Sequence, residues 1–191
     1  AGPLPHDAAL GPENLYGVYK QANEGTAAIF WLEDKLPSIG LRPCVVYGPG
    51  RDQGWTSLPT KAMLAAVAGR KIHMDYGGTI LYQHAGDAAA AIVKAARTKT
   101  ERAPVLNMGG TAASMTEIVS AIAKYAPESA GNITFDDVQI AVPKEIDGSA
   151  LDAAIGKCEW RPIDEGVRQS IEAFRAAVDA GKVDVDRILG G

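Results

Sequence analysis

The chain has 191 residues, of which 47% are hydrophobic and 22% charged, the balance of an ordinary globular protein with one core. The net charge is −4 and the lysines and arginines are scattered, so we expect no nucleic-acid partner, which would require concentrated positive charge. The longest apolar run, residues 62–68, is far shorter than the ~20 residues that cross a bilayer, so no membrane span is expected. The two cysteines, one of them inside an apolar run, favour a reducing, cytoplasmic location.

The first half of the chain alternates predicted helices with short predicted strands. Apolar residues recur at helical spacing from Leu15 to Leu36, where Pro37 stops the pattern. Residues 41–47 indicate a buried strand that ends in a Gly-Pro-Gly loop. A helix over 58–69 follows, capped by Thr56 or Ser57, then strands over 71–75 and 80–84 and an alanine-rich helix over 87–97.

The second half continues the alternation. We expect strands over 105–108, 133–135 and 138–141, and helices over 149–155 and, up to Gly181, around Val167, Ile171, Phe174 and Val178. A capping box, Ser114 with Glu117, opens a further helix that runs through Tyr125, and the tail from Lys182 has no pattern. Alternating helices and short buried strands predict an α/β class with some parallel pairing, although the strands are few for a complete doubly wound sheet.

Tyr16 and Lys20 lie four residues apart near the start of the first predicted helix. Residues at this spacing share a helix face, so the phenol and the ammonium can project into one cleft. A free phenol ionises only near pH ~10, and a nearby cation favours its ionised form. Such a tyrosine can act as a general acid or base at a carbonyl or hydroxyl oxygen, whereas the alternative is an amphipathic helix with a buried tyrosine and a surface lysine.

Five segments in a fixed order carry a resemblance to a known family. They are residues 12–20 (Pro-x-x-x-Tyr-x-x-x-Lys), 41–50 (ending Tyr-Gly-Pro-Gly), 82–89 (with His84 and Asp87), 105–110 (ending Asn-x-Gly-Gly) and 158–162 (with Trp160 and Pro162). Over residues 11–178 the chain resembles the C-terminal portion of the extended short-chain dehydrogenase/reductases, the NAD-dependent epimerases and dehydratases. The resemblance implies the last strands and helices of a partial Rossmann-like fold, plus a small substrate-binding domain.

The resemblance also implies the roles of individual residues. Tyr16 is the expected catalytic acid/base, and Lys20 is expected to favour its phenolate and to hydrogen-bond the nicotinamide ribose. Residues Pro43, Cys44, Val45 and Val46 would lie against the nicotinamide. The loop from Gly48 to Thr56 would line the substrate pocket through Arg51, Gln53, Trp55 and Thr56.

Two features of the family are absent from the sequence. The Gly-x-x-Gly-x-x-Gly turn, which brings backbone N–H groups and a helix N-terminus to the cofactor's pyrophosphate, occurs nowhere. The Ser or Thr that orients the substrate oxygen upstream of the tyrosine is also missing, because none of the residues before Tyr16 is of either type. The chain begins without an initiator methionine or signal peptide. We therefore expect a C-terminal piece that lacks the nucleotide-binding half, with NAD or NADP binding doubtful for this piece alone.

The substrate side departs from the family as well. Val45 and Val46 stand where nucleotide-sugar members carry an asparagine, and Ile80 stands where they carry an arginine. Without these polar anchors, a free sugar acid, a lactone-forming sugar or another small carbonyl compound is an alternative substrate to a nucleoside-diphosphate sugar. Arg42, Arg51 and Lys61 are candidate replacements, although each is more often a solvated surface charge. His84 near Asp87 is interpreted as a strand-end histidine beside a helix cap, not as a metal ligand, because no second ligand has metal-site spacing.

Two functional readings follow from these residues. The first is an NAD(P)-dependent sugar or sugar-nucleotide epimerase, dehydratase or oxidoreductase, present as an inactive fragment. The second is a non-catalytic binding or scaffolding domain that keeps the fold. In either reading, strands without their partners would leave exposed edges, so we expect a homodimer or other self-association.

Overall fold

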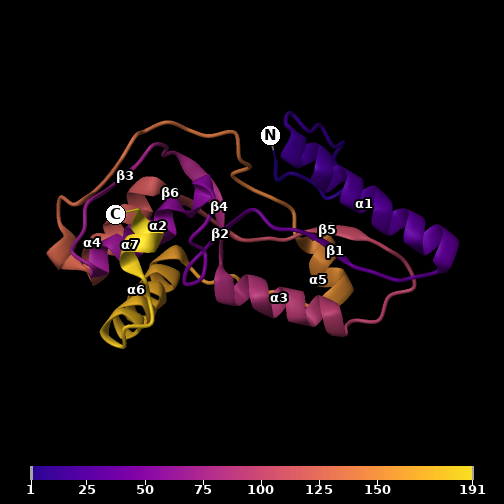
Figure 1. The fold of residues 1–191 in the computed structure, drawn as a ribbon. Helices are drawn as coiled ribbons and strands as arrows, with labels where there is room; N and C mark the ends of the chain where they lie inside the picture. The colour runs from indigo at the N-terminus through magenta and orange to yellow at the C-terminus, as the bar shows by residue number, and fades with distance from the viewer. Residues whose placement is uncertain (1, 191) are drawn as a thin grey trace.

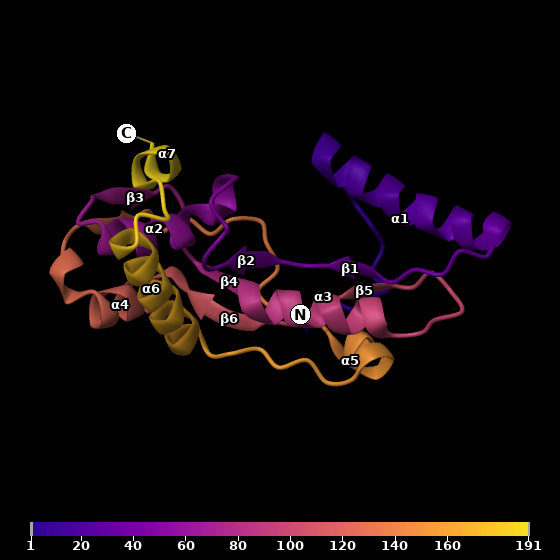
Figure 2. The ribbon, with the colours of Figure 1, turned by 60° about the horizontal axis from the view of Figure 1, so that its bottom comes forward.

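The computed structural model describes residues 2–190. Figures 1 and 2 show an elongated molecule in which one long helix lies at one end, and a helical lobe at the other. The helices are α1 (Leu15–Asp34), α2 (Leu58–Val67), α3 (Ala85–Arg97), α4 (Met115–Tyr125), α5 (Ser149–Ile155), α6 (Ile163–Asp179) and α7 (Val185–Leu189). The strands are β1 (Gly40–Arg42), β2 (Val45–Tyr47), β3 (Ile72–Met74), β4 (Thr79–His84), β5 (Val105–Asn107), β6 (Thr111–Ser114) and β7 (Ile133–Phe135).

The strands form three small sheets. β1 pairs with β5, and β3 pairs with β7, each in parallel. β4 is central in the third sheet, parallel to β2 and antiparallel to β6. The predicted α/β class with parallel pairing is confirmed, because three of the four strand pairs are parallel.

The single strand predicted over 41–47 is divided into β1 and β2. Pro43 has no N–H to donate to a ladder, so pairing is interrupted there. The side chain of Gln83, only 1% exposed, links the two sheets at this break. Its Oε1 accepts from the backbone N–H of Cys44 at 3.0 Å, and its Nε2 donates to the carbonyl of Met108 at 3.2 Å and to that of Gly109.

Two apolar clusters lie on either side of this junction. The larger packs α2, α4 and α6 against β2, β4 and β3, and includes Leu64, Met115, Ile122, Ile171 and Phe174. The smaller lies between β5, α3 and α5, around Leu106, Met108 and Leu151. Among the described residues, no helix is both long and apolar enough to cross a membrane.

The long helix α1 forms as predicted but buries none of its residues. It ends at Asp34, two residues before the predicted end, because Lys35 adopts a left-handed conformation and its N–H caps the last turn. Large apolar side chains along it are exposed, including Leu15, Tyr19, Ile29, Phe30 and Leu32. Figure 1 shows α1 at the edge of the molecule, beside β1 and β5.

Three sequence predictions were wrong. Residues 138–141 form no ladder; the segment makes one isolated bridge at Gln139, whose side-chain amide exchanges hydrogen bonds with the backbone of Thr79. The strand β6 was missed, because Thr-Ala-Ala-Ser has weak strand preference and forms only through pairing with β4. The tail contains α7, which Asp184 caps by accepting from the N–H of Arg187 at 3.0 Å.

A polar cluster joins the start of α3 to α6. The guanidinium of Arg161 donates to both oxygens of Asp87, with Nε at 2.9 and 3.0 Å, and the Arg161 N–H donates to the same carboxylate at 3.0 Å. Burial acts to raise the pKa of Asp87, but these hydrogen bonds outweigh it and hold that pKa below its usual range. His84 ends β4, as expected from the sequence, and it is itself the N-cap of α3, because its Nδ1 accepts the Gly86 N–H at 3.1 Å.

The same hydrogen bonds assign the tautomer of His84 and the partners of the Ser170 hydroxyl. With Nδ1 accepting, the proton sits on Nε2, which lies 3.3 Å from the Ser170 hydroxyl. That hydroxyl donates to the carbonyl of Gly166 at 2.7 Å. Burial, and then the charge of Arg161, lower the pKa of His84, so the ring is kept neutral as part of the scaffold.

We expect the stability of the fold to fall when His84 is forced to take a proton. Its folded pKa lies below the unfolded value of about 6.5, so the unfolded state binds more protons and stability declines as the pH drops below ~6.5. Arg161 and Asp87 are the charged groups facing the ring, and Asp87 contributes its own loss only below about pH 4. The free energy of unfolding, measured with urea at pH values from 7.5 to 5, should therefore depend less steeply on pH in His84→Asn than in the unsubstituted protein. Equal slopes, or the same reduction in the exposed control His73→Asn, would contradict this assignment.

Gly166 in α6 is required by the close approach of Tyr47. A Cβ added at Gly166 would lie 1.8 Å from the Tyr47 hydroxyl oxygen, which is too close for two non-bonded atoms. We expect Gly166→Ala to lower the free energy of unfolding by about 1–3 kcal/mol through overpacking, measured by urea unfolding. The matched control is Gly25→Ala in α1, where the added Cβ would meet nothing within 4 Å and no loss is expected.

Candidate functional site

The helix that carries the tyrosine and lysine begins at a well-formed cap. Asn14 is extended, and its Oδ1 accepts the N–H of Gly17 at 2.9 Å. One turn of helix then places Tyr16 and Lys20 on the same face, with the Lys20 ammonium 5.1 Å from the centroid of the Tyr16 ring. The Tyr16 side chain is 71% exposed, so both groups are accessible from the surface of this chain.

Tyr16 and Lys20 line an open groove of about 560 Å³ between the N-terminal segment, α1 and β1. Its other walls come from Leu10, Gly11, Pro12, Gly17, Gln21, Asn23, Glu24, Ala27, Gly40, Leu41, Arg42, Pro43 and Val105. The groove therefore brings one expected nicotinamide contact, Pro43, next to the tyrosine and lysine.

An ion pair holds this groove together. Arg42 in β1 donates from Nε and Nη2 to the two oxygens of Glu24 in α1, each at 2.7 Å, and from Nη1 to the carbonyl of His6 at 2.8 Å. The hydrogen bonds that Arg42 donates to Glu24 raise the pKa of Arg42 above its already high usual value. Arg42 is thus engaged within the chain, and it is neither the solvated surface charge that the sequence favoured nor the substrate anchor given as the alternative.

The remaining residues of the predicted nicotinamide contact segment point elsewhere. Cys44 is half-buried beside the core, and burial raises the pKa of its thiol to about 11. Val45 is buried in the larger apolar cluster, while Val46 packs against the smaller one. Val45 and Val46 therefore help to hold β2 in place, and Pro43 alone of the four lines the groove.

The predicted substrate loop is organised separately from the groove. Arg51 donates from Nη2 to the Thr56 hydroxyl at 3.2 Å, and Gln53 lies exposed in the loop between them. The Trp55 indole donates to Asp75 Oδ1 at 2.7 Å and meets the Tyr76 ring edge-on, with centroids 5.2 Å apart. Trp55 is 54% exposed, so its indole ring is fixed by these contacts and is still accessible to solvent. Sequence reasoning missed Asp75, because nothing in its neighbourhood signals a partner for Trp55.

Comparison with known proteins identifies the family of this chain. A model of the NAD dependent epimerase/dehydratase family matches residues 3–109, which include Tyr16, Lys20 and the substrate loop. A search among curated proteins gave no match. Among solved structures, MoeE5 in complex with UDP-glucuronic acid and NAD is 26% identical, with a TM-score of 0.76, over 93% of this chain and 60% of that protein.

Two other solved structures share the fold at lower identity. UDP-glucose 4-epimerase from Thermotoga maritima is 18% identical, with a TM-score of 0.79 over 93% of this chain and 59% of its own. UDP-glucuronic acid 4-epimerase from Bacillus cereus is 21% identical, with a TM-score of 0.76 over 97% of this chain and 58% of its own. The chain thus spans about 60% of the length of these proteins. Since the family model covers more than half of its residues, the chain belongs to the NAD-dependent epimerase/dehydratase family, and its fold is part of the Rossmann-like fold of the extended short-chain dehydrogenase/reductases.

Proposed function

We propose that this chain is the C-terminal, substrate-binding part of an NAD(P)-dependent sugar or sugar-nucleotide epimerase, dehydratase or related oxidoreductase. The observation that carries the proposal is the Tyr16–Lys20 pair, exposed in one groove within the residues that the family model matches. In the complete enzyme, Tyr16 is the catalytic acid/base and the loop around Trp55 contacts the substrate. Residues 1–191 include the substrate-binding part, and a nucleotide-binding half completes the domain.

The described residues fit one end of the cofactor and not the other. A phenol and an ammonium beside an open groove of about 560 Å³ can hydrogen-bond the ribose hydroxyls next to a nicotinamide, and Pro43 offers an apolar contact. No glycine-rich turn in the sequence can supply backbone N–H groups to the pyrophosphate. When bound in the complete enzyme, the nicotinamide supplies hydride chemistry, and this chain supplies orientation and proton transfer.

The proton chemistry depends on two side chains. The Tyr16 phenol holds or removes the proton of a substrate hydroxyl at the reacting carbon. The ammonium of Lys20 lies 5.1 Å from the centroid of the Tyr16 ring, where it can also hydrogen-bond the oxygen atoms of a bound ligand. The Glu24–Arg42 pair keeps the helix that carries both groups against β1, so that their position relative to Pro43 is constant.

A sugar or sugar nucleotide is the substrate class that the loop supports. MoeE5, the most similar in sequence of the structures described above, binds UDP-glucose and UDP-glucuronic acid. In this chain, Trp55 offers a flat aromatic face for a ring, and Arg51 with Gln53 and Thr56 offers polar groups beside it. Val45, Val46 and Ile80 replace the polar anchors expected for a diphosphate, which favours Arg51 as the anion contact.

The complete enzyme would also cover surfaces that this chain leaves open. Within residues 2–190, β1 pairs along one edge only, and the apolar side chains of α1 are exposed. We propose that the nucleotide-binding half and a second copy of the protein cover them, giving a homodimer. A strictly monomeric state at high concentration in sedimentation analysis would contradict the self-association.

The alternative is a non-catalytic binding domain that retains the fold. The missing glycine turn and the absence of Ser or Thr before Tyr16 favour it. In a protein that includes the nucleotide-binding half, the enzyme proposal predicts turnover that depends on Tyr16, whereas the binding-domain proposal predicts no such dependence.

We expect this chain by itself to show no saturable binding of NAD⁺ or NADP⁺ up to millimolar concentration, because the pyrophosphate has no N–H cradle. Tryptophan fluorescence, with Trp55 near the substrate loop, and isothermal calorimetry provide the two measurements. Saturable binding would mean that another part of residues 1–191 holds the pyrophosphate, and the proposed division of the domain would be wrong.

In a protein that includes the nucleotide-binding half, we expect Tyr16→Phe to lower turnover by about 10²–10⁴-fold while cofactor binding is retained, since proton transfer is lost but shape is kept. Tyr19→Phe is the matched control, because Tyr19 is equally exposed on the same helix but is absent from the groove lining. Normal turnover of the Tyr16 variant, or an equal loss in the Tyr19 variant, would contradict the catalytic role.

A further inference from the structure

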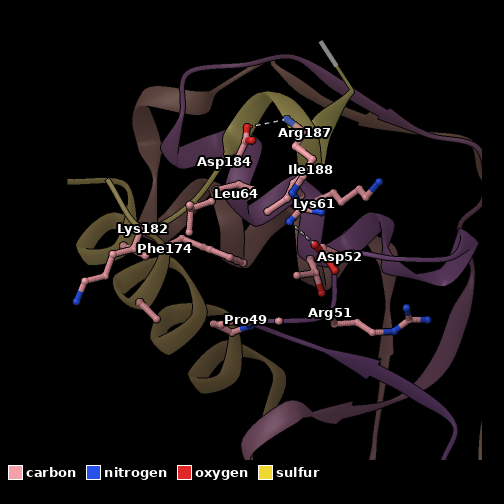
Figure 3. A pocket seen from close by; sticks show the side chains of 15 residues that line it. Pro49, Arg51, Asp52, Lys61, Leu64, Phe174, Lys182, Asp184, Arg187 and Ile188 are labelled. Atoms are coloured by element: carbon pink, nitrogen blue, oxygen red, sulfur yellow. Dashed lines mark hydrogen bonds and ion pairs between the residues drawn. The ribbon is translucent and has the colours of Figure 1, made fainter. Parts of the chain in front are cut away.

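A second cavity, of about 240 Å³, lies at the opposite end of the molecule from α1, beneath the C-terminal segment. Figure 3 shows its walls: the loop at Pro49–Asp52, one face of α2, one face of α6 and the segment from Lys182 to Ile188. It shares no lining residue with the groove beside Tyr16 and Lys20. The proposed catalytic pair therefore takes no part in this cavity, and Arg51 is the one proposed substrate contact that lines it.

One side of the cavity is apolar. Leu64 of α2 and Phe174 of α6, 1% and 6% exposed, line it together with the apolar residues Ala177, Val183 and Ile188. A surface of this kind favours a hydrocarbon body over water. The volume lies below the roughly 300 Å³ at which sites for drug-sized ligands begin, so the occupant is small.

The other side is polar and centres on Arg187. Its guanidinium reaches from α7 to Asp52, with Nη2 3.0 Å from Oδ2 (Figure 3). This is the one hydrogen bond recorded for the guanidinium within residues 2–190, so four of its five N–H donors remain available to a planar anion. Arg187 is thus a cation held at the edge of an apolar cavity.

The charges around the cavity favour an anion. Four cationic residues line it, Arg51, Lys61, Lys182 and Arg187, against two carboxylates, Asp52 and Asp184. Both carboxylates are already engaged, Asp52 by Arg187 and Asp184 by the backbone N–H that it caps. The side chains of Arg51 and Lys182 point away from the cavity in Figure 3, so they contribute a positive field and Arg187 makes the contact.

We propose that this cavity binds a small organic carboxylate with an apolar chain. The carboxylate accepts hydrogen bonds from Arg187, and the chain lies over Leu64 and Phe174. Because Pro49–Asp52 forms one wall, the ligand contacts the loop that also carries the proposed substrate contacts Arg51, Trp55 and Thr56. The site contains neither Tyr16 nor Lys20 and does not depend on the proposed proton chemistry.

Hexanoate, hexanol and hexylamine each have six carbon atoms and differ in the charge of the head group. Comparing their affinities therefore separates the contribution of the charge to binding from that of the hydrocarbon chain. We expect hexanoate to bind with a dissociation constant on the order of 1 mM, hexanol roughly tenfold more weakly, and hexylamine not measurably. Calorimetry gives the affinities, and amide chemical shifts of residues 49–64 and 173–188 locate the site. Absence of hexanoate binding, equal affinity for hexanol, or tighter binding of hexylamine would each overturn the proposal.

Three variants test the location and the anchor. Arg187→Gln removes the cation and should weaken hexanoate roughly tenfold while leaving hexanol unchanged. Arg70→Gln is its control, because Arg70 pairs with Asp186 in the same short helix but does not line the cavity, so it loosens α7 equally without removing the anchor. Ala177→Leu fills the cavity and should abolish binding of both ligands. Unchanged hexanoate affinity in Arg187→Gln or Ala177→Leu would show that the carboxylate binds elsewhere. An equal loss of affinity in Arg70→Gln would show that binding depends on an ordered α7 and not on the Arg187 guanidinium.

Discussion

The amide of Gln83 is the interaction on which the arrangement of this molecule depends. The chain turns away from one sheet and enters another at Pro43, where no backbone N–H is available to continue a ladder. Gln83 accepts from Cys44 and donates to Met108 and Gly109, so a single buried side chain satisfies backbone groups of both sheets. A buried backbone group without a hydrogen-bond partner costs about 1–3 kcal/mol. The side chain of Gln83 avoids this cost, which explains why a polar residue lies between the two apolar clusters.

The two sides of that junction differ in how deeply their side chains are buried. On one side, α2, α4 and α6 enclose a core with fully buried tyrosines, methionines and aliphatic residues. On the other side, α1 rests on β1 through the Glu24–Arg42 ion pair and buries no residue of its own. The residues proposed for catalysis therefore lie on the least buried element, whereas the proposed substrate loop is anchored to the well-packed lobe by Trp55 and Asp75.

The two cavities follow this division. The groove beside Tyr16 is open because α1 and β1 meet through charged side chains and leave apolar surface uncovered. The cavity beside α7 forms where the C-terminal segment lies against α2 and α6, and two ion pairs, Arg187–Asp52 and Arg70–Asp186, join that segment to the rest of the lobe. The loop at residues 48–56 is in contact with the second cavity and presents Trp55 on its outer face.

The sequence by itself determined the class of the fold, most elements and the family. Periodicity, caps and breakers located α1 to α6, since Pro37 and the Ser114–Glu117 capping box act through neighbours a few residues away. The Tyr16–Lys20 spacing likewise predicted their proximity, because helix geometry alone places them on one face. Only the tertiary structure decided that Arg42 is engaged with Glu24, that Trp55 is held by Asp75, that β6 is a strand and that residues 138–141 are not. Each of these depends on a partner distant in the chain, and Gln83, read from sequence, is merely one polar residue in an apolar strand.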